Sequence, residues 1–169
     1  EVEKCLLSLS KCYNGKAFNI SEYTDFYSCK NHALNASKII RGEDAELPNN
    51  WYSLPVAYNG RASSVLVTGS NISRPTGQIF DQESGVIKFE PTRKMDFELE
   101  IGTVIGGSLP VSKVLDFEEA ENLIFGYVLL NDWSARDIQA WEYQPLGPFL
   151  SKSFGTSISP WIITPEALE

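Results

Sequence analysis

The feature that most constrains the fold is a nearly continuous apolar run over residues 123–131, LIFGYVLLN. A short apolar run of this kind predicts a strand that is buried inside the protein. The run ends at Asp132, and the end of a buried strand is a common place for functional groups. The search for a functional site therefore begins at this carboxylate.

Residues 96–101, DFELEI, alternate strictly between acidic and apolar side chains. Since side chains alternate between the two faces of a strand, the pattern predicts a strand over 96–105 with Glu98 and Glu100 on the same face. Two carboxylates so placed repel each other unless water solvates them or a cation bridges them. Alternation is also the ordinary pattern of a half-buried strand with one wet face, so spacing alone leaves both interpretations open.

The rest of the sequence predicts a mixed, β-rich chain with short helices between strands. Clusters of proline and glycine predict irregular chain over 48–60 and mostly turn over 69–78. Ser112 is the expected N-cap of one helix, and Ser134 with Asp137 is the expected start of another. We expect extended chain over 23–29, strands over 63–68, 86–90 and 157–163, and helices over 32–41, 112–122 and 135–143.

The N-terminal residues 1–20 differ in character from the rest. Apolar residues within 2–9 mark one face of a short helix, which ends at Asn14-Gly15. The chain has 169 residues, the length of one domain or of a piece of a larger protein. We expect residues 1–20 to be a linker or the end of a small domain, and residues 21–169 to form the main domain.

Composition excludes several classes of function. The formal net charge is −8 and the pI is about 4.7, so we expect no nucleic-acid partner. No apolar run approaches the roughly 18–20 residues of a membrane-spanning helix, so we expect no membrane association. Three cysteines without a CxxC pair, and a single histidine, argue against zinc and indicate reduced thiols in a cytoplasmic protein. No phosphate-binding loop or nucleophile-elbow motif is present.

Four carboxylates are candidates for binding a divalent cation: Asp25, Glu98, Glu100 and Asp132. Asp25 lies in an aromatic-rich stretch, and the other three follow from the two strand patterns above. Hard oxygen donors of this kind suit Ca²⁺ or Mg²⁺ better than zinc or copper. The acidic composition is compatible with such a site, although acidity does not demonstrate one.

Other polar residues are candidates for catalysis or substrate binding. His32 is the only histidine, so any imidazole base must be His32, although a lone histidine is more often structural or exposed. Arg136, Gln139 and Tyr143 share one face of a predicted helix, a face that either binds an anionic substrate or is simply solvated. Lys152 follows a turn rich in proline and glycine, where most lysines are exposed.

Several stretches of the chain resemble the fumarylacetoacetate hydrolase family. They are DFYSCKNHALN (25–35), LPVAYNGRASSVLVTG (54–69), RPTGQ (74–78), MDFELE (95–100) and NDWSARDIQAWEYQPLGPFLSKSFGTSISPW (131–161). The resemblance covers essentially all of 23–168. Its motifs are similar to the branch that cleaves fumarylacetoacetate rather than to the wider group of acylpyruvate hydrolases.

The resemblance implies a fold, an activity and partners. The implied fold is a β-rich catalytic domain with a sheet rolled around a metal site, here incomplete at its C-terminal end and a homodimer when complete. The implied activity is metal-dependent hydrolysis of a carbon–carbon bond of 4-fumarylacetoacetate, a small diketo acid. The products would be fumarate and acetoacetate, in the last step of tyrosine and phenylalanine catabolism. The implied cofactor is Ca²⁺, Mg²⁺ or both.

The resemblance also implies a role for each candidate residue. The metal carboxylates would be Asp25, Glu98, Glu100 and Asp132, with Lys152 and Thr156 at further positions near the metal. The residues that hold the substrate would be Tyr27, Arg41, Tyr58, Gln139 and Tyr143. His32 matches the general base, and Arg136, Gln139 and Lys152 match the groups that stabilise developing negative charge.

Two positions depart from the family pattern. Asn59 stands where the family usually has histidine, and Ser151 where it has glycine. The family's chain also extends on both sides of this segment, and the acidic partner of its catalytic histidine lies in the C-terminal part. Two alternatives therefore stay open: a truncated, non-catalytic module that binds metal or dimerises, and a related acylpyruvate hydrolase.

Overall fold

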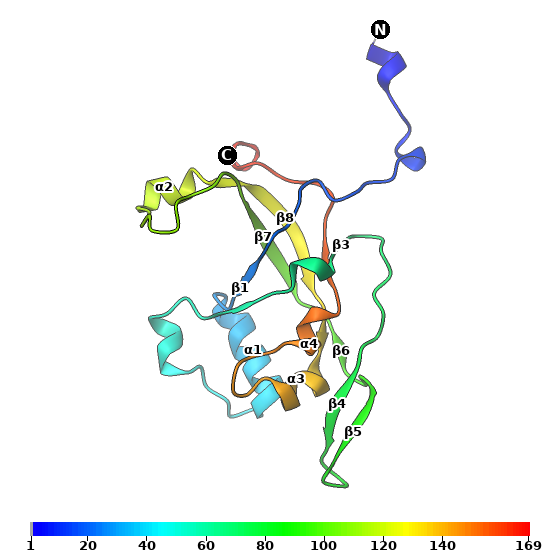
Figure 1. Ribbon diagram of the computed structural model, residues 1–169, viewed down its shortest axis with the longest axis vertical. Coiled ribbons are helices and arrows are strands. Elements are labelled where there is room, and N and C mark those ends of the chain that lie inside the picture. Colours follow the sequence, from blue (N-terminus) through cyan, green and yellow to red (C-terminus); the bar gives the residue numbers. More distant parts are fainter. Residues whose placement is uncertain (1) are drawn as a thin grey trace.

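The computed structural model describes residues 2–169 (Figure 1). Its strands are β1 (Thr24–Phe26), β2 (Ala57–Asn59), β3 (Val65–Val67), β4 (Thr76–Asp81), β5 (Val86–Pro91), β6 (Met95–Asp96), β7 (Leu99–Ile105), β8 (Ile124–Asp132), β9 (Ser134–Ala135) and β10 (Thr156–Ile158). Its α-helices are α1 (Lys30–Arg41), α2 (Phe117–Glu121), α3 (Arg136–Glu142) and α4 (Leu150–Ser153). The fold is thus mixed α/β, with short helices between strands.

The central feature is a four-stranded sheet in the order β3-β10-β8-β7. β8 confirms the strand predicted from the apolar run, and it pairs antiparallel with both neighbours. Thr156 of β10 lies opposite Asp132, and Leu99 of β7 lies opposite Asn131. Only one face of β8 is buried, because Leu129 is 56% exposed while Val128 is buried.

The strands of residues 2–169 do not form one rolled sheet. Besides the four-stranded sheet they make three separate pairs, β1-β2, β4-β5 and β6-β9. Two small apolar clusters lie between these elements. One joins Val65, Val128 and Ile158 of the large sheet, and the other joins Ile79, Ala135 and Ile138 where β4 meets α3.

The turn predicted over 69–78 is wrong in its last part, because β4 begins at Thr76 and pairs with β5 as a hairpin. Gly77 is buried in this strand, where an added Cβ would lie 2.9 Å from Cδ1 of Ile138. The glycine therefore allows β4 to pack closely on α3 rather than to make a turn. Sequence alone does not show this contact, since the two segments are sixty residues apart.

The helices begin at residues other than those predicted. α1 confirms the predicted helix over 32–41 and starts two residues earlier. α2 is much shorter than expected and is capped by Asp116, not Ser112, through a capping box with Glu119. The N-cap of α3 is Ala135, since the Ser134 hydroxyl donates instead to the Asp132 carbonyl.

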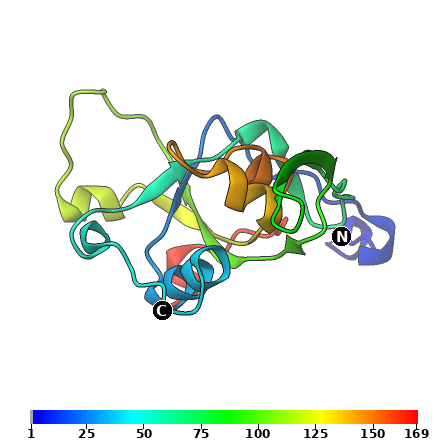
Figure 2. The same cartoon turned by 90° about the horizontal axis from the view of Figure 1, so that it is seen from below.

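Both ends of the chain also differ from the predictions. The predicted strand over 157–163 is only the short β10 followed by an isolated bridge between Ile163 and Tyr127. The predicted N-terminal helix consists of two 3₁₀ turns, Val2–Cys5 and Leu9–Lys11, with no buried residue. Figures 1 and 2 both show this segment outside the body of the chain. No helix within residues 2–169 is long and apolar enough to cross a membrane.

Gly126 of β8 offers a test of how tightly the C-terminal segment packs on the sheet. A Cβ added there would lie 2.5 Å from Cγ2 of Ile162 and 2.7 Å from the Ile163 carbonyl oxygen. We therefore expect Gly126→Ala to lower the free energy of unfolding by about 1–3 kcal/mol in urea denaturation. Gly106→Ala is the matched control, because its nearest neighbour would be 3.5 Å away. Equal stability of the two variants would contradict the packing of this segment.

Candidate functional site

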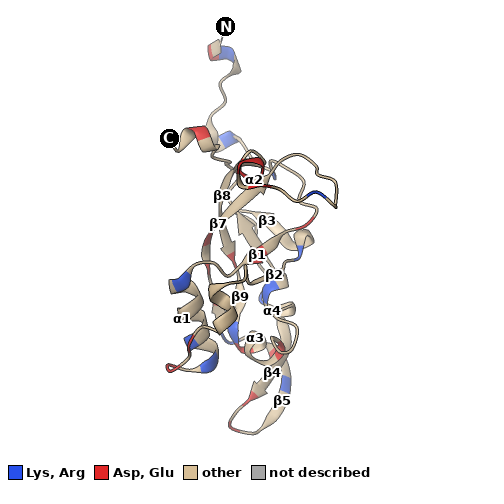
Figure 3. Cartoon of the chain, turned by 90° about the vertical axis from the view of Figure 1, so that its left-hand side faces the viewer, with Lys and Arg blue, Asp and Glu red and all other residues tan. Residues whose placement is uncertain are grey.

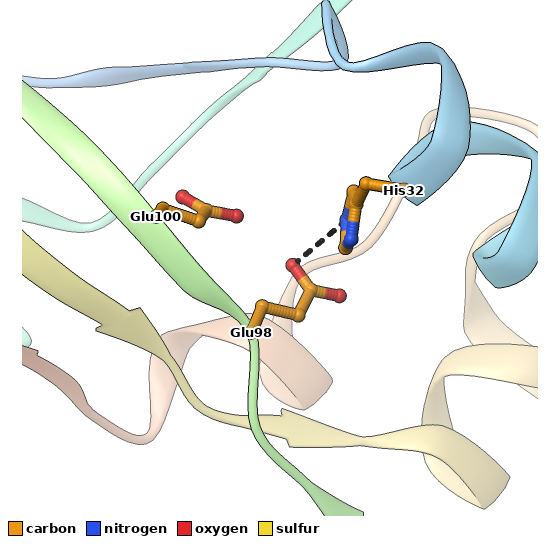
Figure 4. Close-up of side chains that lie close together, drawn as sticks. All are labelled: His32, Glu98 and Glu100. Atoms are coloured by element: carbon orange, nitrogen blue, oxygen red, sulfur yellow. Dashed lines mark ion pairs between the residues drawn. The ribbon is translucent and has the colours of Figure 1, made fainter.

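The carboxylates singled out from the sequence come together in space. Asp25 of β1, Glu100 of β7 and Asp132 at the end of β8 each place an oxygen within 4.8 Å of the other two. His32, Glu98 and Glu100 form a second group by the same measure. Figure 4 shows Glu98 and Glu100 pointing into one space toward His32. The two glutamates thus point the same way as predicted, but the strand predicted over 96–105 is interrupted, and Glu98 lies between β6 and β7.

Backbone pairing places these side chains. Asp132 donates its backbone N–H to the Glu98 carbonyl, at 3.1 Å, just before β7 pairs with β8. β1 is held beside them by pairing with β2, in which Asp25 lies opposite Tyr58. The Tyr58 hydroxyl lies 2.6 Å from Oδ2 of Asp132 and 3.1 Å from Oδ2 of Asp25. It therefore links the β1-β2 pair to the four-stranded sheet.

Three cationic or basic side chains surround Glu98. Arg136 Nη2 lies 2.7 Å from Oε1, Lys152 Nζ lies 2.7 Å from Oε2, and His32 Nε2 lies 3.4 Å from Oε2. Glu98, Arg136 and Lys152 are all buried. Burial opposes the charge of Glu98, but the hydrogen bond from His32 and the charges of Lys152 and Arg136 outweigh it and lower the pKa of this carboxyl. Glu98 is therefore ionised and compensated.

Among the described residues, neither Asp25 nor Glu100 forms an ion pair. Burial, followed by the negative charge of Asp132, raises the pKa of Asp25 to about 7. Burial, followed by the charges of Asp25 and Asp132, raises the pKa of Glu100 to about 9. Lys152 Nζ also reaches Oδ2 of Asp132, at 2.6 Å, but Oδ1 of Asp132 is buried without a hydrogen-bond partner. Among the described residues, Asp25, Glu100 and Asp132 thus have a single ion-pair partner, Lys152.

These residues fit a hard divalent cation. An unpartnered buried carboxylate oxygen is costly, and raised carboxyl pKa values show that the group of acids lacks positive charge. Ca²⁺ and Mg²⁺ take carboxylate oxygens as ligands. Asp25, Glu100 and Asp132 offer three such oxygens from three strands, and Glu98 lies beside them.

A pocket of about 550 Å³ opens beside the cluster, between α1 and α3. Figure 3 shows basic segments, in blue, on α1, whose last turn carries Arg41. Arg41 is held by a 2.7 Å hydrogen bond to the buried Ser37 hydroxyl. All residues predicted to be catalytic or to hold a substrate line this pocket: Tyr27, His32, Arg41, Tyr58, Arg136, Gln139, Tyr143 and Lys152.

Thr156 does not line this pocket but a second, larger cavity. It is fully buried, and its hydroxyl lies 3.1 Å from the Tyr23 hydroxyl. Asp25, His32 and Glu100 line the same cavity of about 1100 Å³ as Thr156. Of the two departures, Asn59 lines the smaller pocket, whereas Ser151 is buried and bonds to Glu142.

Sequence reasoning missed residues that hold the site together. Asp96 accepts a 2.8 Å hydrogen bond from Nε of Arg136, and so helps Glu98 to fix this guanidinium. The alternating stretch DFELE could have indicated Asp96, because Asp96 is two residues before Glu98 and is therefore expected on the same face of a strand. Tyr23 and Ser134 had no comparable signal, since their roles depend on contacts across the fold.

Comparisons with known proteins identify relatives. Residues 22–169 match the family model described as Fumarylacetoacetate (FAA) hydrolase C-terminal. The chain is 52% identical over 150 residues to a fumarylacetoacetase from Arabidopsis thaliana, covering 89% of this chain and 36% of that protein. It is 50% identical over 169 residues to one from Dictyostelium discoideum, with 99% and 40% covered. It is 50% identical over 149 residues to a fumarylacetoacetase from Bos taurus, covering 88% of this chain and 36% of that protein. The chain thus spans well under half the length of these curated relatives.

The carboxylate cluster predicts that cation binding releases protons. Without a cation, Glu100 with a pKa of about 9 is protonated at pH 7, and Asp25 with a pKa of about 7 is half protonated. Because a cation binds the ionised forms, we expect roughly one to one and a half protons released per Ca²⁺ at pH 7. Affinity should rise from pH 6 to pH 8 by about 10²–10³-fold. Calorimetry in two buffers of different ionisation enthalpy measures the release.

The same experiment with Glu100→Gln provides the control. This variant removes the group with the higher pKa, so its remaining release should come mainly from Asp25 and fall below one proton. Binding without proton release in the parent chain would show that these carboxyls are not the ligands.

A second prediction concerns the buried Asp132. Asp132→Asn removes a charge from the centre of the cluster, so we expect Ca²⁺ affinity to fall at least about tenfold. Equilibrium dialysis measures it, with Asp44→Asn, an exposed position outside the cluster, as the matched control. Equal affinity of the two variants would exclude Asp132 as a ligand.

Proposed function

Because the chain belongs to the fumarylacetoacetate hydrolase family, we propose that this protein hydrolyses a carbon–carbon bond of 4-fumarylacetoacetate to give fumarate and acetoacetate. This is the last step of tyrosine and phenylalanine catabolism. One observation carries the proposal beyond family membership. Arg136, Lys152 and His32 meet around Glu98, beside a pocket and a group of carboxylates in which only Asp132, among the described residues, has an ion-pair partner.

The proposed cation is Ca²⁺ or Mg²⁺. Asp25, Glu98, Glu100 and Asp132 would hold it, with Lys152 and Thr156 nearby. When bound, the cation would act as a Lewis acid toward the two keto oxygens of the substrate. The unpartnered Oδ1 of Asp132 and the raised pKa values of Asp25 and Glu100 support this assignment.

The pocket beside the cluster is the proposed substrate site. Its volume of about 550 Å³ is within the range of small-molecule sites. Arg41 is exposed at one side of the pocket and is suited to a substrate carboxylate. Tyr27, Tyr58, Gln139 and Tyr143 offer further hydrogen-bonding groups around the same space.

His32 is the proposed general base. It would take a proton from a water molecule whose oxygen attacks the substrate carbonyl carbon. Arg136, Gln139 and Lys152 would donate to the oxyanion formed in this attack. The carbon–carbon bond then breaks, its electron pair leaves as the enolate of acetoacetate, and the proton held by His32 passes to that carbon. Edge-to-face contact with Tyr27, at 5.9 Å between ring centroids, orients the imidazole.

Several wider features belong to the same proposal. A homodimer is supported by the apolar outer face of β7 and β8, where Leu99, Ile101 and Leu129 are each more than half exposed. A cytoplasmic location is supported by Cys12 and Cys29, which are exposed and form no disulfide. In the proposed organisation, residues 21–169 are catalytic domain, residues 1–20 are a linker or the end of a small domain, and the complete sheet rolls around the metal site.

Substrate hydrolysis by His32→Ala tests the mechanism. General acid–base catalysis contributes about 10²–10⁴-fold, so we expect the variant to lose at least about 10²-fold in kcat while retaining Ca²⁺ binding. Loss of fumarylacetoacetate absorbance reports the rate, with and without a chelator. Asn35→Ala, an exposed position on the same helix, is the matched control. A His32→Ala rate equal to that of the control would exclude His32 as the base, and faster cleavage of a simple acylpyruvate would reassign the substrate.

A further inference from the structure

Glu142, the last residue of α3, gathers three hydrogen bonds on one carboxylate oxygen. The backbone N–H groups of Phe149 and Ser151 donate to Oε1 at 2.9 and 2.8 Å. The Ser151 hydroxyl donates to the same oxygen. Glu142 therefore ties the end of α3 to the start of α4 across the intervening loop.

The residue after Ser151 is Lys152. Its side chain is only 3% exposed, and Nζ lies 2.7 Å from Glu98 and 2.6 Å from Asp132. The backbone N–H of Ser151, which Glu142 fixes, is thus one residue before Lys152, whose side chain bridges Glu98 and Asp132. A shift of Ser151 moves the start of the Lys152 side chain with it.

Two kinds of contact join α4 to α3 and its neighbours, apart from the ion pairs of Lys152 itself. Leu150 packs on the apolar cluster of Ile79, Ala135 and Ile138. On the polar side, Phe149 at the N-cap position offers no side-chain acceptor, and Glu142 supplies one. An apolar contact restricts the distance of α4 from α3 more than its rotation, whereas directional hydrogen bonds restrict rotation. The direction in which Lys152 points therefore depends on Glu142.

We propose that Glu142 is a positioning residue for Lys152, acting through the hydrogen bonds to Phe149 and Ser151. Glu142 is not among the residues that line the pocket or the carboxylate cluster, so it does not touch substrate or cation. The same helix carries Arg136 and Gln139, which are buried at the pocket. Glu142 thus keeps the groups of α3 and the ammonium of α4 in one arrangement. The catalytic consequence, but not the positioning itself, rests on the proposed function.

Chemical labelling of lysines tests the positioning without any substrate. We expect acetic anhydride, followed by peptide mass spectrometry, to label Lys152 of Glu142→Ala at least about fivefold faster than in the parent chain. Lys88 and Lys113, whose side chains are 39% and 42% exposed, should be unchanged. Glu118→Ala on α2 is the matched control. Unchanged labelling of Lys152 in Glu142→Ala overturns the proposal.

A general rise at all lysines would instead show that Glu142→Ala has lost its fold. Glu142→Gln then decides the matter, because it weakens the three hydrogen bonds while keeping the side-chain shape. We expect a rise of about twofold confined to Lys152, and no rise overturns the proposal.

Kinetics of a double-variant cycle test the catalytic consequence. Since a misplacement of about 1 Å can reduce a rate 10²-fold, Glu142→Ala should lower kcat about 10- to 100-fold with KM changed less than about threefold. In a Lys152→Ala background the same substitution should have no further effect. Additive losses would show that Glu142 acts on something other than Lys152. If the parent chain does not hydrolyse the substrate, the proposed function fails, and labelling alone decides the positioning role.

Discussion

A carboxylate buried among cations is stable only while its partners stay in place, and Glu98 is such a carboxylate. Its partners come from three helices: His32 from α1, Arg136 from α3 and Lys152 from α4. Removing one partner leaves the others with an uncompensated buried charge. α3 and α4 also contact each other directly through Glu142 and Ser151, whereas Glu98 is the side chain that joins all three helices at the site.

Charge is unevenly distributed around Glu98. Arg136 and Lys152 line the smaller pocket together with Asp25, whereas Glu100 lines the larger cavity, and the pKa values of Asp25 and Glu100 are raised. Tyr58 and Lys152 both contact Oδ2 of Asp132, which leaves Oδ1 without a partner. A cation among the carboxylates and an anion in the pocket would each meet the complementary charge, so one arrangement favours both.

Local patterns in the sequence predicted the parts of this site that depend on a single strand or helix. The alternation of DFELE placed Glu98 and Glu100 on one side, and the apolar run placed Asp132 at the end of β8. Helical spacing placed Arg136 and Gln139 together, and their side chains are hydrogen-bonded at 2.9 Å. The relations of Asp132 and of Arg136 with Gln139 each lie within one element, where the period of the backbone fixes them, whereas Glu98 lies just outside β7.

Relations between elements were beyond those patterns. Pro75 and Gly77 predict a turn over residues 69–78, yet Gly77 allows β4 to pack on Ile138. The turn before Lys152 predicts an exposed side chain, although this lysine is buried against Glu98 and Asp132. Only the resemblance to a known family joined Lys152 to the site before the structure did. The buried state of a lysine depends on partners that are distant in sequence, and no local period records them.

The carboxylates of the site and its basic groups lie on different kinds of element. Three of its carboxylates lie on strands whose backbones are paired, with Glu98 directly before β7, so their oxygens stay at fixed separations. The basic and amide groups lie on short helices that are held by side-chain contacts, which a single substitution can shift. Under the proposed function, substitutions in the helices should therefore alter turnover more than cation binding, whereas substitutions in the strands should alter both. The pocket is built mainly from helices and loops, so substitutions there can change which molecule fits without moving the paired strands that place the carboxylates.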